Sequence, residues 1–328
     1  MKVFVTGASG FIGRVLCAFL QGQGCKVRAL LRRETEGPWD EAVVCQLGYD
    51  SLPVQSLQDI DTVFHLAGMV HAMKPGEGEK LLYETVNVRG SETVAIAAVE
   101  SGVRSFVYFS SVKAVGDPGE KCVDERWQIL PQDPYGLSKH EAEKRLLGFG
   151  RRSSMHLSVL RPALVYGPDA KGNLQRMIEA IDAGRFPPLP ETGNRRSMVH
   201  VDDLIEAAWL AATHPQANGE VYIVSDGEAY SSRQIYEWIT EALGRKLPAW
   251  HIPAPVLGIA ASVGDVLQHI PGCRVPFNSE VFQRLTGSAC YEAGKLRQDL
   301  DWLPRRRLYE ALPDMVAAYR QLRPIGLS

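Results

Sequence analysis

The chain has 328 residues, of which 45% are hydrophobic and 23% are charged, and its formal net charge at pH 7 is −2. This is typical of a globular α/β protein with one large domain and a smaller lobe. The balanced charge argues against a nucleic-acid partner, which would need clustered Lys and Arg. The longest apolar stretch, near Pro253–Val263, is interrupted by Pro and Gly and is too short to cross a bilayer.

None of the six cysteines belongs to a C-x-x-C motif, so the sequence predicts neither a zinc ribbon nor a redox dithiol, and no metal site. Several lie in apolar contexts, as expected of small core residues in a reducing compartment. The apolar N-terminus runs into a Gly-rich turn rather than a signal-peptide cleavage site. We therefore expect a cytoplasmic protein without a membrane partner.

Short apolar segments alternate with helical ones along the first half of the chain. The predicted strands are Lys2–Thr6, Lys26–Leu31, Asp61–Leu66, Ser105–Ser110 and Leu157–Arg161. They are almost wholly apolar rather than alternating, as in parallel strands covered on both faces. The main helical patterns between them are Leu81–Ser101 and Tyr135–Leu147. This βαβ order predicts an α/β fold with a Rossmann-type doubly wound parallel sheet.

The βαβ rhythm weakens after Pro162, where Pro and Gly become more frequent. One later strand, Val221–Val224, is expected to return to the sheet. We therefore predict a nucleotide-binding domain over residues 1–165, joined by about 195–224. Residues 166–194 and 225–328 are expected to form a smaller, mostly helical substrate-binding lobe.

A glycine triplet, Gly7-Ala-Ser-Gly10-Phe-Ile-Gly13, joins the first predicted strand to a helix. Gly7 permits a sharp turn, Gly10 lets the backbone approach a pyrophosphate, and Gly13 lets the helix pack close to the strand. The free N–H groups and positive dipole end of that helix attract phosphates. Strand, triplet and helix at the start of a βαβ unit predict a dinucleotide site.

Two arginines, Arg32 and Arg33, follow the second predicted strand, where an NAD-selective site usually has an acid for the ribose 2′-hydroxyl. They suit a 2′-phosphate or adenine stacking, although a solvated strand end is the alternative. The choice between NAD and NADP stays open at this point.

Tyr135 and Lys139 are four residues apart, which places both side chains on one face of a helix. A tyrosine has a reference pKa near ~10, and a nearby ammonium together with a cationic nicotinamide ring would stabilise its phenolate. Ser111 ends a predicted strand at the sheet edge where such folds bind ligands. The three residues therefore predict proton transfer to a carbinol or ketone oxygen that also exchanges hydride.

Matching motifs occur along nearly the whole chain: Thr6-Gly-Ala-Ser-Gly-Phe-Ile-Gly13, His65-Leu-Ala-Gly68, Asn87-Val-Arg-Gly90, Phe109-Ser-Ser-Val-Lys113, Pro134-Tyr-Gly-Leu-Ser-Lys139, Arg161-Pro-Ala-Leu-Val-Tyr-Gly-Pro168 and Arg196-Ser-Met-Val-His-Val-Asp202. With these motifs the sequence resembles the extended short-chain dehydrogenase/reductases, in the NAD-dependent epimerase/dehydratase group. The resemblance implies that Ser111, Tyr135 and Lys139 are catalytic and that Lys139 also holds the nicotinamide ribose.

The sequence and the resemblance together give the expected cofactor contacts: Gly7, Ser9, Gly10, Phe11, Ile12, Gly13, Arg32, Arg33, Gln46, Leu47, Leu66, Ala67, Gly68, Asn87, Ser110, Tyr135, Lys139, Pro162, Leu164 and Val165. The family often has Gly-Asp-Leu where this chain has Cys45-Gln46-Leu47. Gln46 retains a carbonyl that can accept the adenine hydrogen bond. Asp301 also stands where relatives usually have Gly.

The residues after Ser111 narrow the reaction. The family's dehydratases carry an Asp-Glu pair there, and its decarboxylating members need a Glu in the same loop, whereas this chain has Val112-Lys113. The 3,5-epimerase/reductases use a Cys/His pair, and no cysteine lies in this loop. Of the family's reactions, hydride exchange at a carbinol, by an epimerase or a reductase, is the one that this loop still permits.

Arg196 resembles an arginine that binds the substrate diphosphate in nucleotide-sugar epimerases, and an Arg fork suits phosphate. A surface salt bridge is the alternative. Asn173 resembles another phosphate contact, with a helix N-cap as its alternative. Lys113 is a candidate contact to sugar or phosphate, and the loop residues His71 and Lys74 are candidates to face substrate.

We therefore predict a UDP-glucose 4-epimerase-like enzyme that uses NAD or NADP at C4 of a UDP-hexose. The alternatives are a 4-keto-6-deoxy UDP-sugar 4-reductase, a dihydroflavonol- or steroid-type ketone reductase, and a non-catalytic dinucleotide-sensing module. By resemblance, the helices 81–101 and 135–147 pair across a homodimer.

Overall fold

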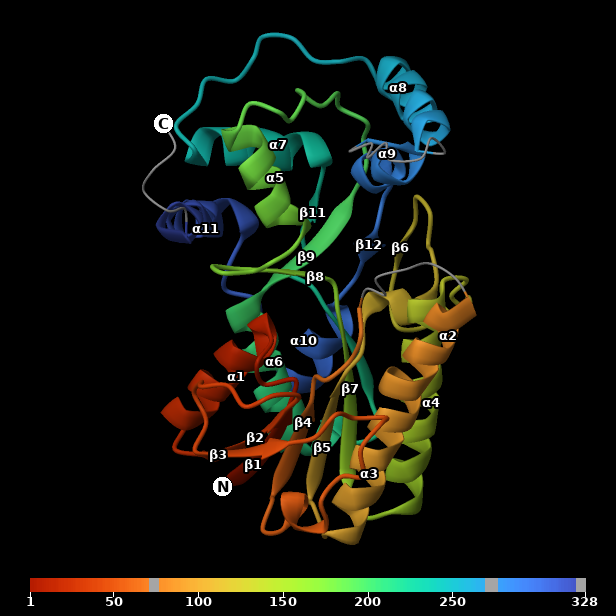
Figure 1. Cartoon of the computed structure of the whole chain (residues 1–328), viewed down its shortest axis with the longest axis vertical. Helices are drawn as coiled ribbons and strands as arrows, with labels where there is room; N and C mark the ends of the chain where they lie inside the picture. Colours follow the sequence, from red (N-terminus) through yellow and green to blue (C-terminus); the bar gives the residue numbers. More distant parts are fainter. Residues whose placement is uncertain (71–76, 269–276, 323–328) are drawn as a thin grey trace.

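The structure is a computed structural model that describes residues 1–70, 77–268 and 277–322. His71, Lys74 and Cys273 lie outside the described residues. Seven parallel strands form the main sheet in the order β10-β7-β5-β4-β1-β2-β3 (Figure 1). Their bounds are β1 Lys2–Thr6, β2 Lys26–Leu31, β3 Glu41–Val44, β4 Thr62–His65, β5 Ser105–Phe109, β7 His156–Pro162 and β10 Val221–Val224. The chain thus has the predicted Rossmann-type sheet.

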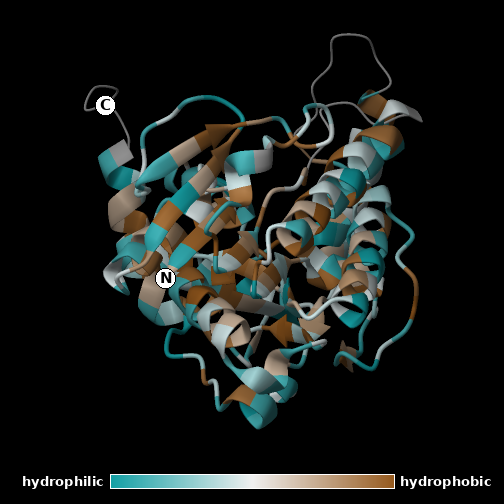
Figure 2. Cartoon of the chain, turned by 90° about the horizontal axis from the view of Figure 1, so that it is seen from below, coloured by the Kyte–Doolittle hydropathy of each residue, from teal (hydrophilic) through white to brown (hydrophobic). Residues whose placement is uncertain are grey.

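Apolar helices cover both faces of this sheet. On one face, α1 (Phe11–Gly22) and α6 (Val201–Thr213) bury one hydrophobic cluster. On the other, α3 (Gly90–Glu100) and α4 (Pro134–Arg152) bury a second one. Figure 2 shows hydrophobic residues gathered between the helices and hydrophilic ones on their outer sides. The nearly unbroken apolar strands follow from this double covering, because neither face of the sheet meets water.

Most predicted elements are confirmed, including the late strand β10, which pairs in parallel with β7. The predicted helix over 81–101 is observed as α2 (Glu77–Tyr83), a π-helical turn η2 (Glu84–Arg89) and α3. The edge strand β3 was missed. It has four residues and is largely exposed, so it lacks the apolar pattern of its neighbours.

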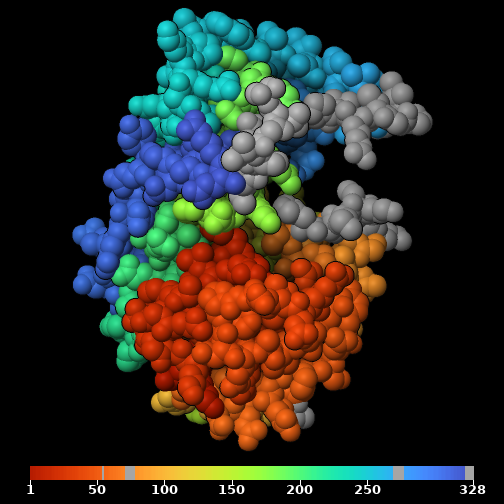
Figure 3. Space-filling model, turned by 60° about the vertical axis from the view of Figure 1, so that its left-hand side comes forward, coloured from red at the N-terminus to blue at the C-terminus, as the bar shows by residue number. Residues whose placement is uncertain are grey.

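The C-terminal lobe consists of α5 (Asn173–Asp182), α7 (Ser232–Ala242), α8 (Ala254–Leu267), α9 (Ser279–Thr286) and α11 (Leu308–Leu322). It lies above a three-stranded sheet formed by β8 (Leu164–Tyr166), β9 (Arg196–His200) and β11 (Ala229–Tyr230) (Figure 1). N-terminal residues, in red and orange, form one continuous face below this lobe (Figure 3). None of the described helices combines the length and apolarity needed to cross a membrane.

Two short strands, β6 (Cys122–Val123) and β12 (Cys290–Tyr291), pair outside these sheets. A disulfide joins Cys122 to Cys290, 168 residues apart in the sequence. Cys17, Cys25 and Cys45 are buried free thiols, as predicted for core cysteines. The expectation of reduced core residues is wrong for the bonded pair, which tertiary structure brings together without any short motif.

Helix α10 (Gly294–Leu300) explains one departure from the family pattern. It ends at Asp301, whose backbone is left-handed, with φ 51° and ψ 28°. Glycine adopts this conformation without a steric penalty, and Asp is among the few other residues that tolerate it. Asp301 therefore occupies a helix C-cap at which glycine is the more comfortable residue.

Candidate active site

The glycine triplet forms a turn in which the backbone is too crowded for side chains. Gly7 has φ +70°, and a Cβ there would lie 2.9 Å from the Ala67 backbone nitrogen. A Cβ on Gly13 would lie 2.2 Å from the Gly7 carbonyl oxygen. The first turn of α1 carries no acidic residue, so its N–H groups and positive dipole end are available to an anion.

A cavity of about 510 Å³ opens beside this turn. Nine of the thirteen cofactor contacts predicted before residue 69 line it: Gly7, Ser9, Gly10, Arg32, Gln46, Leu47, Leu66, Ala67 and Gly68. Phe11, Ile12 and Gly13 belong to α1, and Arg33 is exposed and is not part of the lining. Glycines facing a helix N-terminus at one end, and Arg32 with Gln46 at the other, fit a dinucleotide cofactor.

A buried hydrogen-bond chain holds the cofactor loop in place. Thr6 Oγ1 lies 2.7 Å from His65 Nδ1, and His65 Nε2 lies 2.8 Å from Ser91 Oγ. The Ala67 N–H donates to Thr6 Oγ1 at 3.0 Å. Burial lowers the pKa of His65 to about 3, so this histidine is a neutral structural residue.

Asn87 is fully buried behind this loop rather than in the cavity lining. Its side-chain oxygen accepts a hydrogen bond from the Met69 N–H at 2.7 Å. Its amide donates to the Met69 carbonyl at 3.1 Å and to Ser138 Oγ at 2.9 Å. Asn87 therefore connects the cofactor loop to α4, the helix that carries Tyr135.

The predicted catalytic residues come together at the N-terminus of α4. Asp133 caps the helix, accepting a hydrogen bond from the Gly136 N–H at 2.9 Å. Ser111, whose hydroxyl acts to lower the pKa of Tyr135, caps the short 3-10 helix η3 (Val112–Val115). Lys139 lies below them, 4% exposed, and its Nζ donates to the Phe109 carbonyl at 2.9 Å.

The electrostatics of the pair are those of the cofactor-free site. Burial raises the pKa of Tyr135 to about 12, and the Ser111 hydroxyl only partly opposes this. Lys139 does not lower it, because its ammonium is directed to the Phe109 carbonyl and lies 4.9 Å from the Tyr108 ring centre. Without a bound cofactor, the phenol is therefore protonated at neutral pH.

Two further residues near this pair were missed from the sequence. Glu143, one helical turn beyond Lys139, forms a buried ion pair with Arg161 at 2.6 Å. Burial lowers the pKa of Lys139 to about 8, and the negative charge of Glu143 opposes that shift. The i, i+4 spacing from Lys139 to Glu143 is a sequence signal that could have found this counter-ion.

Tyr83 of α2 is the other missed residue. Its ring centre lies 5.9 Å from that of Tyr135. Its hydroxyl donates to the Val70 carbonyl at 3.2 Å, at the end of the cofactor loop. Tyr83 thus contacts the catalytic ring and the loop together, a role that only tertiary contact reveals.

The remaining predicted cofactor contacts lie at strand ends. Ser110 follows β5, and its Oγ is buried without a hydrogen-bond partner among the described residues, which leaves it available to a bound group. Pro162 ends β7, and Leu164 and Val165 belong to β8. In the main sheet β7 lies next to β5, so Pro162 and Ser110 lie at the ends of neighbouring strands.

The predicted substrate contacts occupy different environments. Arg196 begins β9, and its Nη1 donates to the Arg284 and Gly287 carbonyls at 2.7 and 2.9 Å, so its partners are backbone groups near the end of α9 and not a carboxylate. Lys113 is exposed in η3, next to Ser111. Asn173 is exposed as the first residue of α5. Gly172 is the N-cap, so the N-cap alternative for Asn173 is wrong.

Comparisons with known proteins agree with this geometry. The model of the NAD-dependent epimerase/dehydratase family matches residues 3–225. A UDP-glucose 4-epimerase of Vibrio cholerae is 30% identical and aligns with 98% of this chain and 96% of its own. A 4-hydroxy-2-methyl-3-oxo-4-farnesyl-3,4-dihydroquinoline-1-oxide ketoreductase of Stigmatella aurantiaca is 28% identical, with 99% and 98% covered.

Among solved structures, MoeE5 in complex with UDP-glucose and NAD superposes with a TM-score of 0.76 at 26% identity, covering 98% of this chain and 99% of that one. The family match, the relative at 30% identity and the assembled Ser111, Tyr135 and Lys139 agree. The chain belongs to the NAD-dependent epimerase/dehydratase family of extended short-chain dehydrogenase/reductases, and it is an NAD(P)-dependent epimerase or oxidoreductase.

Proposed function

We propose that this enzyme interconverts the C4 epimers of a UDP-hexose. The observation that carries the proposal is the approach of Ser111 to Tyr135, on the same helix as buried Lys139, with Val112 and Lys113 in place of an acid pair. This set handles one proton at one oxygen and has no second acid and base for eliminating water. The Vibrio cholerae relative, a UDP-glucose 4-epimerase, supports a sugar nucleotide as substrate.

Tyr135 is the group that exchanges the proton with the sugar 4-hydroxyl. Ser111 Oγ hydrogen-bonds the same oxygen and fixes its position. With cofactor and substrate bound, Lys139, kept charged with help from Glu143, is proposed to stabilise the phenolate while Tyr135 is deprotonated, a role that it does not have in the cofactor-free site. The bound dinucleotide supplies the hydride acceptor and donor. Tyr135 returns the proton once the 4-keto sugar has presented its other face.

Recognition of the UDP group is assigned to the region around β9. Arg196 Nη1 is engaged by two carbonyls, and its other guanidinium N–H groups are proposed to bind the diphosphate. Exposed Lys113 and Asn173 are proposed as further contacts to phosphate or sugar. Arg196→Lys would keep the charge but lose the planar fork. It should raise KM for the UDP-sugar by about tenfold, a cost of roughly 1.4 kcal/mol, with kcat little changed.

For the cofactor we propose NAD, supported by the MoeE5 complexes with NAD. Arg32 lines the cavity at the end of β2 and is the residue able to accept a 2′-phosphate. Arg32→Ala should therefore weaken NADP binding by about tenfold or more and NAD binding much less. Arg33→Ala, outside the lining, is the matched control. Equal losses of NAD and NADP affinity in Arg32→Ala would show that Arg32 does not bind the 2′-phosphate.

The decisive experiment uses the purified protein and UDP-glucose without added cofactor. Formation of UDP-galactose, followed by chromatography, is expected because an epimerase regenerates its cofactor in every turnover. A panel of UDP- and dTDP-sugars then defines the sugar. No epimer from any member of the panel, together with NAD(P)H-dependent reduction of a 4-keto-6-deoxy sugar, would replace the epimerase with a 4-reductase.

A ketone reductase of the dihydroflavonol or steroid type is the second candidate. The Stigmatella aurantiaca ketoreductase, matched over nearly its full length, favours it. Such an enzyme has no need of Arg196 as a diphosphate contact. UDP should compete with substrate in the epimerase and leave ketone reduction unaffected. Since the chain is an enzyme of this family, a non-catalytic sensing module is no longer proposed.

We also propose a homodimer formed through α2, α3 and α4. Four large apolar side chains on these helices are exposed in the single chain: Leu81 63%, Ile96 42%, Val99 38% and Leu137 39%. A second copy covering them would remove this apolar area from water. Light scattering should give twice the monomer mass of 36.2 kDa. A monomer at micromolar concentration would contradict the assignment.

A further inference from the structure

The disulfide Cys122–Cys290 joins two parts of the chain that bear different residues of the site. Cys122 lies between Ser111 and Tyr135, in the segment that connects the catalytic residues. Cys290 lies in β12, after the C-terminal lobe helix α9. The two strands form a parallel ladder of only two pairs, Cys290 with Cys122 and Tyr291 with Val123. The covalent bond therefore reinforces a short, weak pairing.

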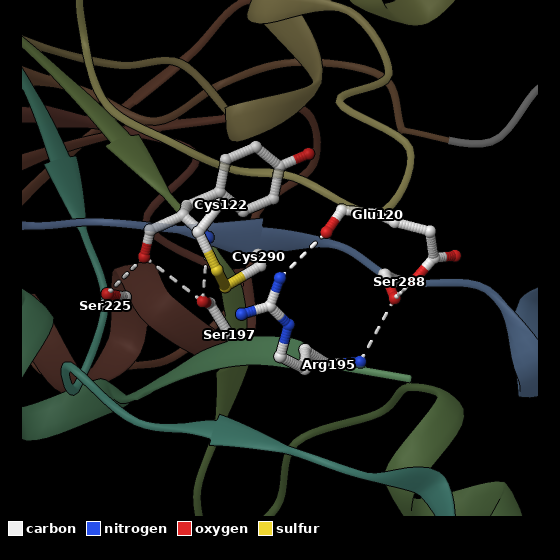
Figure 4. The surroundings of a disulfide bond; sticks show 8 residues. Glu120, Cys122, Arg195, Ser197, Ser225, Ser288 and Cys290 are labelled. Carbon is white, nitrogen blue, oxygen red and sulfur yellow. Dashed lines mark hydrogen bonds between the residues drawn. A yellow bond between two sulfur atoms is a disulfide. The ribbon is translucent and has the colours of Figure 1, made fainter. Parts of the chain in front are cut away.

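Polar contacts extend this junction to Arg195, the residue directly before β9 (Figure 4). The Arg195 guanidinium donates to the Glu120 carbonyl at 2.8 Å. Ser288 Oγ bonds the Glu120 carboxylate at 2.8 Å and accepts from the Arg195 N–H at 3.2 Å. Glu120 and Cys122 are two residues apart, so this segment is held by the residues that precede β9 and β12 and, through the disulfide, by β12 itself.

The backbone on both sides of Arg196 is held by the segment that contains Cys290. The Ala289 N–H donates to the Arg195 carbonyl at 2.7 Å, and the Ser197 N–H donates to the Ala289 carbonyl at 2.9 Å. Ser197 Oγ also bonds the Tyr291 backbone at both N–H and carbonyl. A movement of β12 would therefore displace Arg196.

The disulfide is also reachable from outside. A cavity of about 530 Å³ is lined by both cysteines, together with Ser197, Ser225 and Tyr291. This volume admits a small dithiol, although Cys290 itself is only 4% exposed. The buried thiols Cys17, Cys25 and Cys45 are not part of that lining. Thiol–disulfide exchange requires such access of an attacking thiolate to one sulfur.

We propose that Cys122 and Cys290 form a thiol–disulfide exchange site. In its oxidised form the bond holds the segment between Ser111 and Tyr135 close to β9, the strand that begins at Arg196. A dithiol reductant of the cell attacks one sulfur, and the other leaves as a thiolate that takes up a proton. The second reductant thiol then releases the mixed disulfide. The protein gains two thiols, and the reductant becomes a disulfide, so two electrons are transferred in all. Oxidation by a disulfide of the same class reverses the reaction.

The expected consequence separates binding from chemistry, and this part rests on the proposed function. Opening the bond leaves Ser111 at the N-cap of η3 and both Tyr135 and Lys139 in α4, so kcat should change little. Without the disulfide, β12 no longer holds Arg196 in a fixed position, so KM for the UDP-sugar should rise about fivefold or more. NAD binding, at the opposite end of the site, should be unaffected.

The first test needs no substrate. Wild-type protein is equilibrated in oxidised and in reduced dithiothreitol, alkylated and digested, and its peptides are identified by mass spectrometry. A Cys122–Cys290 peptide pair is expected only under oxidation. Limited proteolysis should cut within residues 117–133 faster after reduction. Free Cys122 and Cys290 under oxidation, or identical cleavage rates, would overturn the proposal.

The second test compares kinetics in the two redox states. The KM of the wild type should rise on reduction, while Cys122→Ala and Cys290→Ala should show the raised KM in both buffers. Cys25→Ala, which removes a buried free thiol, is the matched control and should retain the redox response. A KM that stays unchanged on reduction would refute the fastening role. If no UDP-sugar reacts, the proposed function fails, while the peptide and proteolysis results still decide the exchange site.

Discussion

The two ends of the candidate site are built by different means. At the dinucleotide end, a strand–turn–helix of consecutive residues, Lys2–Gly22, supplies backbone groups whose spacing leaves no room for side chains. At the opposite end, Arg196 is placed by carbonyls near α9 and by β12, which follow it by about 90 residues. Local backbone geometry tolerates few changes. Long-range side-chain contacts can each be changed by a single substitution, and substrate recognition can therefore change step by step.

Removing the Tyr135 hydroxyl should have the largest effect. It tests whether the chemistry depends on Tyr135 and not on the Arg196 end of the site. Tyr135→Phe should lower kcat by about 10²–10⁴-fold, since it deletes the acid–base group and leaves its ring in place. Single-turnover product formation measures the loss. Tyr309→Phe, at a half-exposed tyrosine of α11, is the matched control and should keep full activity. Retention of a tenth of the activity by Tyr135→Phe would move the chemistry to another residue.

The crowded turn can be broken with one methyl group. Gly13→Ala places a Cβ 2.2 Å from the Gly7 carbonyl oxygen, where only backbone can yield. We expect a destabilisation of about 1–3 kcal/mol, a fall in melting temperature of roughly 1–4 °C and loss of dinucleotide binding. Gly22→Ala, in the same helix with open space around it, should be neutral or slightly stabilising. Thermal unfolding with and without NAD measures both, and equal behaviour of the two variants would contradict the close packing.

A pH profile tests the buried charge beneath the catalytic pair. Because the pKa of Lys139 lies near 8, kcat should be full below that pH and fall as the pH rises through it, when the ammonium is lost. Glu143 raises this pKa, so Glu143→Gln should move the alkaline limb to lower pH by about one unit. Glu141→Gln removes a carboxylate that pairs with Arg145 on the same helix and should leave the limb in place. If the alkaline limb of the kcat profile does not shift in Glu143→Gln, Glu143 is not the counter-ion of Lys139.

The smallest expected effect lies in the C-terminal half, at the left-handed C-cap of α10. Asp301→Gly should stabilise the protein by about 0.5–1 kcal/mol, because glycine adopts φ 51° without strain. Asp314→Gly, inside α11, should lower stability by a few tenths of a kcal/mol (~0.3) through loss of helix propensity. Denaturant unfolding resolves the opposite signs. Destabilisation by Asp301→Gly would mean that the Asp side chain contributes more than its backbone strain costs.

The contrast between local backbone geometry and long-range contacts also explains which features the sequence predicted. Strands β1, β2 and β10 were predicted with their observed bounds, and Ser111, Tyr135 and Lys139 do assemble. These predictions depend on apolar runs, glycine spacing and helical periodicity, which are local properties. The raised pKa of Tyr135 in the cofactor-free site was not predicted, because its burial and the Phe109 partner of Lys139 depend on elements far apart in sequence.

By itself, the sequence determined a doubly wound sheet, a dinucleotide turn and a tyrosine–lysine pair on one helix face. Each of these follows from residues within one or two turns or strands, where chain connectivity fixes the geometry. Only the tertiary structure decided that Asn87 holds a loop, that Glu143 pairs with Arg161, and that Cys122 meets Cys290. Such contacts arise when distant segments pack into one core, and no local pattern records which partners that packing will select.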